Sequence, residues 1–314
     1  MYRIGIDLGG TNIAAGLVDE EKKIVDSLSI KTNAPRSVAA VIDDMAALVD
    51  ELIVRNGLKR EAITSVGVGV PCTANEENGH LEDANNLGWD DEPFLTLLGE
   101  KLQLPVFFGN DANTAAWAEY RCGDYAEDSF LMLTIGTGIG GGIILGGKLW
   151  AGVNGAAGEF GHLSIKLDGV PCTCGRRGCF EAYGSATALI EQAKEQMERS
   201  SDTVLWTLCG GEIGKVEAKT VFDGAAAGDA VCAAVLDRYT DYLAEGIASV
   251  INLFQPAYLC IGGGVSHAGD ALLIPVREKV KNLRYTQNAK RNTEIILARL
   301  HNDAGIIGAA LLGD

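Results

Sequence analysis

The sequence lacks an excess of positive charge and a long uninterrupted apolar run. It has 26 Lys and Arg residues against 42 Asp and Glu residues, a formal net charge of −16. This charge repels nucleic acid and anionic lipid, so neither is expected as a partner. Two uncharged stretches, residues 129–147 and 246–269, are broken by glycine, proline or amide side chains, so we expect no transmembrane helix.

Other absences narrow the class of protein. Asp7 interrupts the first apolar segment, which argues against a secretory leader, and we expect a soluble cytoplasmic protein. The P-loop pattern G-x-x-x-x-G-K-[ST] and the protein-kinase H-R-D pattern do not occur. Residues 136–141 match G-x-G-x-x-G, but apolar residues 143–145 continue as a strand where a dinucleotide site needs a helix. A dehydrogenase is therefore not expected.

Alternating strand and helix patterns predict an α/β fold. The length of 314 residues and the 47 % hydrophobic fraction favour two domains with real cores. Residues 200–220 are polar and irregular, and we expect a surface excursion there. The expected strands are residues 3–8, 13–19, 24–32, 63–70, 104–108, 131–135, 143–145, 257–261 and 295–297, and the expected helices are 37–56, 113–122, 184–199, 229–254 and 304–312.

Glycine is abundant, with 40 residues, and it gathers in three turns that follow apolar strands. Glycine turns expose N–H groups that bind phosphate oxygens, and the hydroxyls of Thr11 and Thr137 can add donors. Ordinary tight turns are the alternative. The three turns are Gly9-Gly10-Thr11, Gly136-Thr137-Gly138 and Gly262-Gly263-Gly264.

The first strand–turn–strand segment, residues 7–19, has a weak repeat further along the chain. When the two are superposed, Gly9 falls on Gly136 and Leu17 falls on Ile144. The repeat suggests two similar halves that face one cleft. Two unrelated hairpins are the other interpretation.

Two carboxylates stand at the ends of expected strands. Asp7 beside the first glycine turn could hold Mg²⁺ against nucleotide phosphates, or it could only stabilise the turn. Asp111, after Asn110 at a strand–helix junction, could accept the proton of an alcohol during phosphoryl transfer. The other role at that junction is the helix N-cap, and the two roles can coexist.

A cluster of cysteines gives the sharpest signal in the chain. Cys172, Cys174 and Cys179 lie on a short glycine-containing loop, and His162 precedes them by ten residues. Three thiolates and one imidazole complete a tetrahedral, structural zinc site, whereas reduced cysteines without metal are the alternative. Glu159 and Glu181 flank the cluster and could bind sugar hydroxyls, or they could be solvated surface acids. His162 could place one ring nitrogen on the metal and donate to a hydroxyl with the other.

Together these residues resemble the ROK family of sugar kinases, above all its bacterial glucokinases. The resemblance extends from G-I-D-L-G-G-T at residues 5–11 to D-A-G-I-I-G-A-A at 303–310. Its most specific parts are G-A-A-G-E-F-G-H at 155–162 and C-T-C-G-R-R-G-C-F-E at 172–181. The resemblance implies an actin-like ATPase (ribonuclease H-like) fold with two α/β domains around a central cleft. Residues 1–112 plus about 300–314 would form the small domain, and residues 113–299 the large domain with the zinc loop.

The same resemblance implies transfer of phosphate from ATP to the 6-hydroxyl of glucose. Asp111 would be the base, and Asn110, Asp111, Glu159, His162 and Glu181 would contact the sugar. Mg²⁺ and the ATP phosphates would bind at the glycine turns, and structural Zn²⁺ at His162, Cys172, Cys174 and Cys179. Position 12 is basic in many relatives but is Asn12 here, so Mg²⁺ would carry more of the charge neutralisation. The expected nucleotide-site residues are Asp7, Gly9, Gly10, Thr11, Asn12, Gly136, Thr137, Gly138, Ile139, Gly140, Gly141, Gly262, Gly263 and Gly264.

Two other functions are compatible with this family. The substrate could be another sugar, namely N-acetylmannosamine, N-acetylglucosamine, mannose, fructose or allose. A sugar-responsive repressor needs a DNA-binding segment before the core, and here the first strand begins at Arg3 in an acidic chain, so a repressor is not expected. A homodimer or homotetramer is expected from the family.

Overall fold

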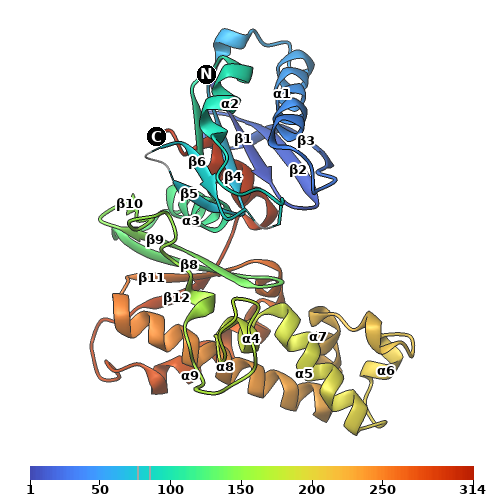
Figure 1. The fold of residues 1–314 in the computed structure, drawn as a ribbon. Coiled ribbons are helices and arrows are strands. Elements are labelled where there is room, and N and C mark those ends of the chain that lie inside the picture. The colour runs from blue at the N-terminus through green and yellow to red at the C-terminus, as the bar shows by residue number, and fades with distance from the viewer. Residues whose placement is uncertain (76–77, 85) are drawn as a thin grey trace. The chain divides into compact units, whose positions relative to one another are not determined.

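The structure is a computed structural model that describes residues 1–75, 78–84 and 86–314. The chain forms two compact units, each with its own helices (Figure 1). The first contains Met1–Asp128, Gly142–Gly158 and Arg299–Asp314, and the second contains Ser129–Gly141 and Glu159–Ala298. These units differ from the expected domains at residues 113–128 and 142–158, which belong to the first unit. Residues 113–122 belong to the first unit because α3 (Asp111–Cys122) packs against α10 (Ala304–Ala310) of that unit.

The sheet of the first unit contains β1 (Tyr2–Leu8), β2 (Asn12–Val18), β3 (Ile24–Lys31), β4 (Ile63–Val70) and β7 (Val106–Asn110). Their order across the sheet is β3-β2-β1-β4-β7. β2 is antiparallel to β1 and β3, whereas β4 is parallel to β1 and β7. Parallel strands end at the same edge of a sheet, so the residues that follow β1, β4 and β7 come together there.

The two faces of β1 meet different layers. The alternate apolar residues, such as Ile6, are fully buried in a core shared with α1 (Val38–Arg55) and α2 (Phe94–Leu102). Gly5 lies on the other face, where an added Cβ would be 1.8 Å from the carbonyl oxygen of Ile306. The missing side chain therefore lets α10 lie directly on the sheet. The unit also contains β5 (Thr73–Asn75), β6 (His80–Glu82), η1 (Arg60–Ala62) and η5 (His301–Asp303).

The second sheet contains β8 (Ser129–Ile135), β9 (Ile139–Leu145), β10 (Lys148–Leu149), β11 (Tyr258–Gly262) and β12 (Glu294–Leu297). Their order is β10-β9-β8-β11-β12, and β11 is parallel to both β8 and β12. With β8 placed on β1, this is the strand order of the first sheet. The matching order favours a repeat of the whole sheet over two unrelated hairpins.

The helices of the second unit lie on one side of β8, β11 and β12 (Figure 1). They are α4 (Glu181–Gly184), α5 (Ala186–Arg199), α6 (Leu205–Leu208), α7 (Ala218–Ala226), α8 (Ala230–Phe254) and α9 (Asp270–Leu283), with the short turns η2 (Phe160–His162), η3 (Ile213–Lys215) and η4 (Gly264–Ala268). The long helix α8 packs against α4, α5, α7 and α9. It begins after Asp229, whose carboxylate accepts the N–H of Cys232 at 2.8 Å, and it ends before Pro256, as expected.

The longest helix also bears on the question of membrane insertion. α8 has 25 residues, but Asp237, Arg238 and Asp241 interrupt its apolar pattern. Across the ranges 1–75, 78–84 and 86–314, no helix has both the length and the apolarity to cross a bilayer.

Candidate functional site

Two carboxylates lie at the common edge of the first sheet. Asp7 pairs in register with Gly69 of β4, and Gly69 pairs with Gly109 of β7, two residues before Asp111. Burial and the nearby Asp111 carboxylate raise the pKa of Asp7 to about 6. Burial also raises the pKa of Asp111, although the backbone N–H of Ala112 partly offsets it. The edge therefore holds two desolvated acids, and the charge of Asp111 disfavours the ionised form of Asp7.

The sequence left two roles open at the junction before α3, the helix N-cap and the acceptor of a proton, and in the structure different residues can take them. Asn110 is the cap, because its side-chain oxygen accepts the N–H groups of Ala112 and Asn113 at 3.0 and 3.1 Å. Its amide donates to the carbonyl of Cys72 at 3.0 Å. Asp111 is the first residue of the helix, and its Oδ1 accepts the N–H of Ala112 at 2.8 Å. Since Asn110 caps the helix, the Asp111 carboxylate is available to face a ligand.

The first glycine turn is held by its own backbone and by the end of β3. The N–H of Gly9 donates to the carbonyl of Asn12 at 2.9 Å, and the hydroxyl of Thr32 donates to the carbonyl of Gly9 at 2.6 Å. The side chains of Thr11 and Asn12 are exposed. The turn between Gly9 and Asn12 is thus fixed and presents polar groups to solvent, a geometry compatible with anion binding.

The second and third glycine turns lie at one edge of the second sheet. β8 and β11 are parallel and in register up to the pair Thr134 and Gly262. Gly263 has φ +79°, and a Cβ there would be 2.5 Å from the carbonyl oxygen of Ile135. The third turn therefore touches the residue that precedes the second turn. Ile139, Gly140 and Gly141, expected as part of the nucleotide site, belong to β9, so only Gly136–Gly138 form the turn.

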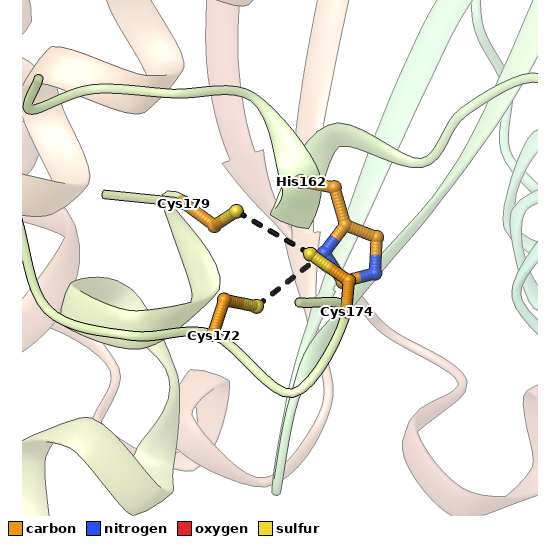
Figure 2. A group of neighbouring side chains, drawn as sticks. All are labelled: His162, Cys172, Cys174 and Cys179. Carbon is orange, nitrogen blue, oxygen red and sulfur yellow. Dashed lines mark hydrogen bonds between the residues drawn. The ribbon is translucent and has the colours of Figure 1, made fainter. Parts of the chain in front are cut away.

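Four side chains of the second unit converge on one point, as Figure 2 shows for His162, Cys172, Cys174 and Cys179. Their ligand atoms all lie within 4.8 Å of one another. The Sγ of Cys172 is 3.7 Å from Nδ1 of His162, and the Sγ atoms of Cys174 and Cys179 are also 3.7 Å apart. Zinc bonds of about 2.3 Å in a tetrahedron separate two sulfurs by about 3.8 Å. The arrangement of the four predicted ligands is thus compatible with a structural zinc site.

The loop that carries the cysteines is shaped by its backbone. The N–H of Cys172 donates to the carbonyl of Arg176 at 2.8 Å, and the N–H of Phe180 donates to the carbonyl of Leu163 at 2.7 Å. Gly178 has φ +77°, and a Cβ there would be 1.7 Å from the carbonyl oxygen of Lys166. Only glycine fits this position, which brings Cys179 back toward His162.

The two glutamates that flank the cluster have different surroundings. Glu159 is exposed, and its Oε2 lies 3.8 Å from Nε2 of His162, the ring nitrogen that faces away from the thiols. Glu181 is half-buried, and its Oε2 accepts the N–H of Ile139 at 2.8 Å. One carboxylate oxygen of Glu181 is therefore already bound to the backbone beside the second glycine turn.

A family model for the ROK family matches residues 3–314. The chain belongs to the ROK family. A glucokinase of Streptomyces coelicolor is 36 % identical to it over 313 residues, covering 98 % of this chain and 96 % of the relative. An N-acetylmannosamine kinase of Escherichia coli O157:H7 is 32 % identical over 312 residues, covering 99 % and 98 %.

Among solved structures, a ROK family glucokinase from Streptomyces griseus in complex with glucose and AMPPNP is closely similar. Its TM-score is 0.85 at 34 % identity, with 99 % of this chain and 98 % of that chain covered. The expected fold class is thereby confirmed: this ROK protein has the mixed α/β fold of the actin-like ATPase sugar kinases.

The structure adds two residues of this ROK chain that the sequence did not single out. Gly305 of α10 lies against the first carboxylate, since a Cβ there would be 2.6 Å from Oδ2 of Asp7. The buried thiol of Cys72 has its pKa raised to about 12, by burial and by the charge of Asp111. The D-A-G sequence at residues 303–305 is part of the family motif, but the motif does not show which carboxylate the glycine touches.

Proposed function

We propose that the protein is an ATP-dependent hexose kinase that phosphorylates glucose at its 6-hydroxyl. One observation carries the proposal: Asp111, released from capping by Asn110, stands with Asp7 at the end of parallel strands in a chain similar to glucokinases over its full length. A carboxylate in this position can accept the proton of a sugar alcohol.

Asp111 is suited to the work of a general base. Phosphoryl transfer needs little covalent chemistry from the protein, and it depends on alignment and on charge stabilisation. Burial raises the pKa of Asp111 and makes the carboxylate a stronger base than an exposed aspartate. The proton of the 6-hydroxyl passes to Asp111 as the oxygen attacks the terminal phosphorus of ATP, and ADP leaves.

Asp7 and the glycine turns would serve the phosphates. Bound Mg²⁺ neutralises phosphate charge, and the Asp7 carboxylate would hold it directly or through water. The N–H groups of the turns at Gly9–Thr11 and Gly136–Gly138 would donate to phosphate oxygens, and Gly262–Gly264 would face the adenosine end. Because residue 12 is Asn12, no cation of this turn reaches the phosphates, and we assign more of the neutralisation to the metal.

The remaining roles follow the family resemblance. Asn110, Glu159, His162 and Glu181 would contact sugar hydroxyls. Zn²⁺, held by His162 through Nδ1 and by the three thiolates, would supply no chemistry and would stiffen the loop. The oligomeric state, the cytoplasmic location and the domain boundary at residue 112 stay predictions.

The substrate is tested by following ADP release with a panel of hexoses. We expect glucose to give the highest kcat/KM, with N-acetylmannosamine as the main competitor because a kinase for that sugar is 32 % identical to this chain. N-acetylglucosamine, mannose, fructose and allose complete the panel, and the Asp111→Asn variant is the negative control. Higher kcat/KM for any other sugar would refute the glucose assignment, and no sugar-dependent ADP release would refute the kinase.

A further inference from the structure

The turn at Gly136–Gly138 is held from outside by the segment that follows the zinc loop. The N–H of Ala186 donates to the carbonyl of Gly136 at 2.8 Å. The hydroxyl of Thr187 donates to the carbonyl of Thr137 at 2.8 Å. These two bonds are made to the carbonyls of Gly136 and Thr137. The N–H groups of the same two peptides, those of Thr137 and Gly138, point to the opposite side.

Glu181 supplies the third contact and the only charged one of the set. Its Oε2 accepts the N–H of Ile139 at 2.8 Å, and a Cβ on Gly138 would lie 2.3 Å from the same oxygen. A carboxylate that occupies the place of a side chain at Gly138 and binds the next N–H fixes the peptide between them. Within the part of the chain that the structure describes, the N–H groups of Thr137 and Gly138 have no acceptor, so they are the donors left for a ligand.

The same glutamate is tied to the cysteine loop. It follows Cys179 by two residues, and the intervening Phe180 is fully buried. Its Oε1 lies 4.0 Å from Sγ of Cys172. Glu181 therefore stands between two candidate metal ligands and the glycine turn, with one carboxylate oxygen directed to each side.

We infer that Glu181 is a positioning residue for the nucleotide: it holds the Gly136–Gly138 turn in its phosphate-binding shape and links that turn to the metal loop. The inference rests on the proposed function, because it takes ATP as the ligand of this turn. It gives Glu181 a role that a sugar contact alone does not require. The shape of the phosphate-binding turn then depends on the cysteine loop through the side chain of Glu181.

The test measures binding of Mg²⁺·AMPPNP by calorimetry to the zinc-loaded full chain without sugar. Loss of a charge-assisted hydrogen bond predicts that Glu181→Ala binds the nucleotide at least about tenfold more weakly. Glu181→Gln keeps an oxygen for the N–H of Ile139 and should stay within about threefold of the parent. Glu198→Ala removes an exposed glutamate of α5 and is the matched control. Thermal unfolding and zinc content show that each variant is folded and loaded.

A second variant keeps the inference testable if Glu181→Ala folds poorly. The three heavy atoms nearest to a Cβ on Gly138 all belong to Glu181, so Gly138→Ala should displace the carboxylate and weaken AMPPNP binding. When Gly138→Ala is combined with Glu181→Ala, the new Cβ no longer collides with a carboxylate. We therefore expect the double variant to bind AMPPNP no more weakly than Glu181→Ala alone. Fully additive losses would overturn the inference.

Three results separate this inference from the proposed function. If Glu181→Ala weakens glucose binding and leaves AMPPNP binding unchanged, Glu181 is a sugar contact and the inference is wrong, although the kinase stands. If the chain phosphorylates no sugar, the proposed function fails, and AMPPNP affinities still decide the role of Glu181. If removing zinc with a chelator weakens AMPPNP binding equally in the parent and in Glu181→Ala, the link to the metal loop is refuted.

Discussion

Replacing Asp7 by asparagine is expected to stabilise the first unit at neutral pH while it impairs the enzyme. Asp7 is desolvated beside Asp111, and its pKa rises from the ordinary 3.8 to about 6. Between these values the folded chain binds more protons than the unfolded chain. Stability therefore falls as pH rises through this window, and the loss is complete above it.

The size of the effect follows from the same two values. A rise from 3.8 to about 6 corresponds to about 3 kcal/mol of destabilisation at pH 8. An asparagine in the same place avoids this cost but still buries an amide, so we expect a net gain of about 1–3 kcal/mol. At pH 4 the carboxyl is largely protonated in the parent as well, and the gain should nearly vanish.

Urea unfolding in metal-free buffer at pH 4 and pH 8 measures this difference. Tryptophan fluorescence reports mainly on the first unit, because Trp89, Trp117 and Trp150 belong to it and only Trp206 belongs to the second. Glu51→Gln, which neutralises an exposed acid on α1, is the control and should change little at either pH. A stabilisation that is equal at both pH values, or no stabilisation at pH 8, would refute the reasoning.

Three further predictions concern the site and its supports. Asp111→Asn should lower kcat by about 10²–10⁴-fold and leave glucose affinity nearly unchanged in calorimetry; near-normal turnover would exclude Asp111 as the base. Purified protein should hold one zinc per chain by emission spectrometry, and Cys179→Ser should lose it and melt at a lower temperature; a metal-free parent would contradict the ligand assignment. Gly305→Ala should destabilise the chain by about 1–3 kcal/mol in denaturant unfolding, because its Cβ would lie 2.6 Å from the Asp7 carboxylate. Gly214→Ala is the control and should not destabilise the chain, because a Cβ there meets no atom within 4 Å. Equal stabilities of the two variants would refute the predicted clash at Gly305.

Long periodic segments and glycine turns made most of the fold predictable from the sequence. The helix expected at residues 229–254 is α8, and the strands before the glycine turns are β1, β8 and β11. The prediction missed α2, α7 and α9. α9 contains Pro275, which interrupts a helical pattern in sequence, yet its buried side chains pack against α8. The segment expected to be an irregular surface excursion contains the short helix α6, in which Leu205 is fully buried. The sequence did not predict this helix, because a short helix has too few apolar positions to show a period.

The candidate site was predictable in its residue types but less so in their partners. The ligand set at His162 and the three cysteines could be read from residue chemistry, and the structure brings these atoms together. That Asn110 takes the cap of α3 and that Glu181 binds the N–H of Ile139 depend on side-chain directions. Sequence spacing does not give these directions, since Glu181 and Ile139 are 42 residues apart.

The direct packing of α10 against β1 has a consequence for the folding of the chain during synthesis. The helix that covers this face of the first sheet is translated only after all of the second unit. A nascent chain therefore lacks the helix that packs against Gly5 of β1 and Gly67 of β4 until residues 304–310 emerge from the ribosome. A chain that ends before residue 304 lacks this helix, so its N-terminal sheet should be more sensitive to protease than that of the full chain.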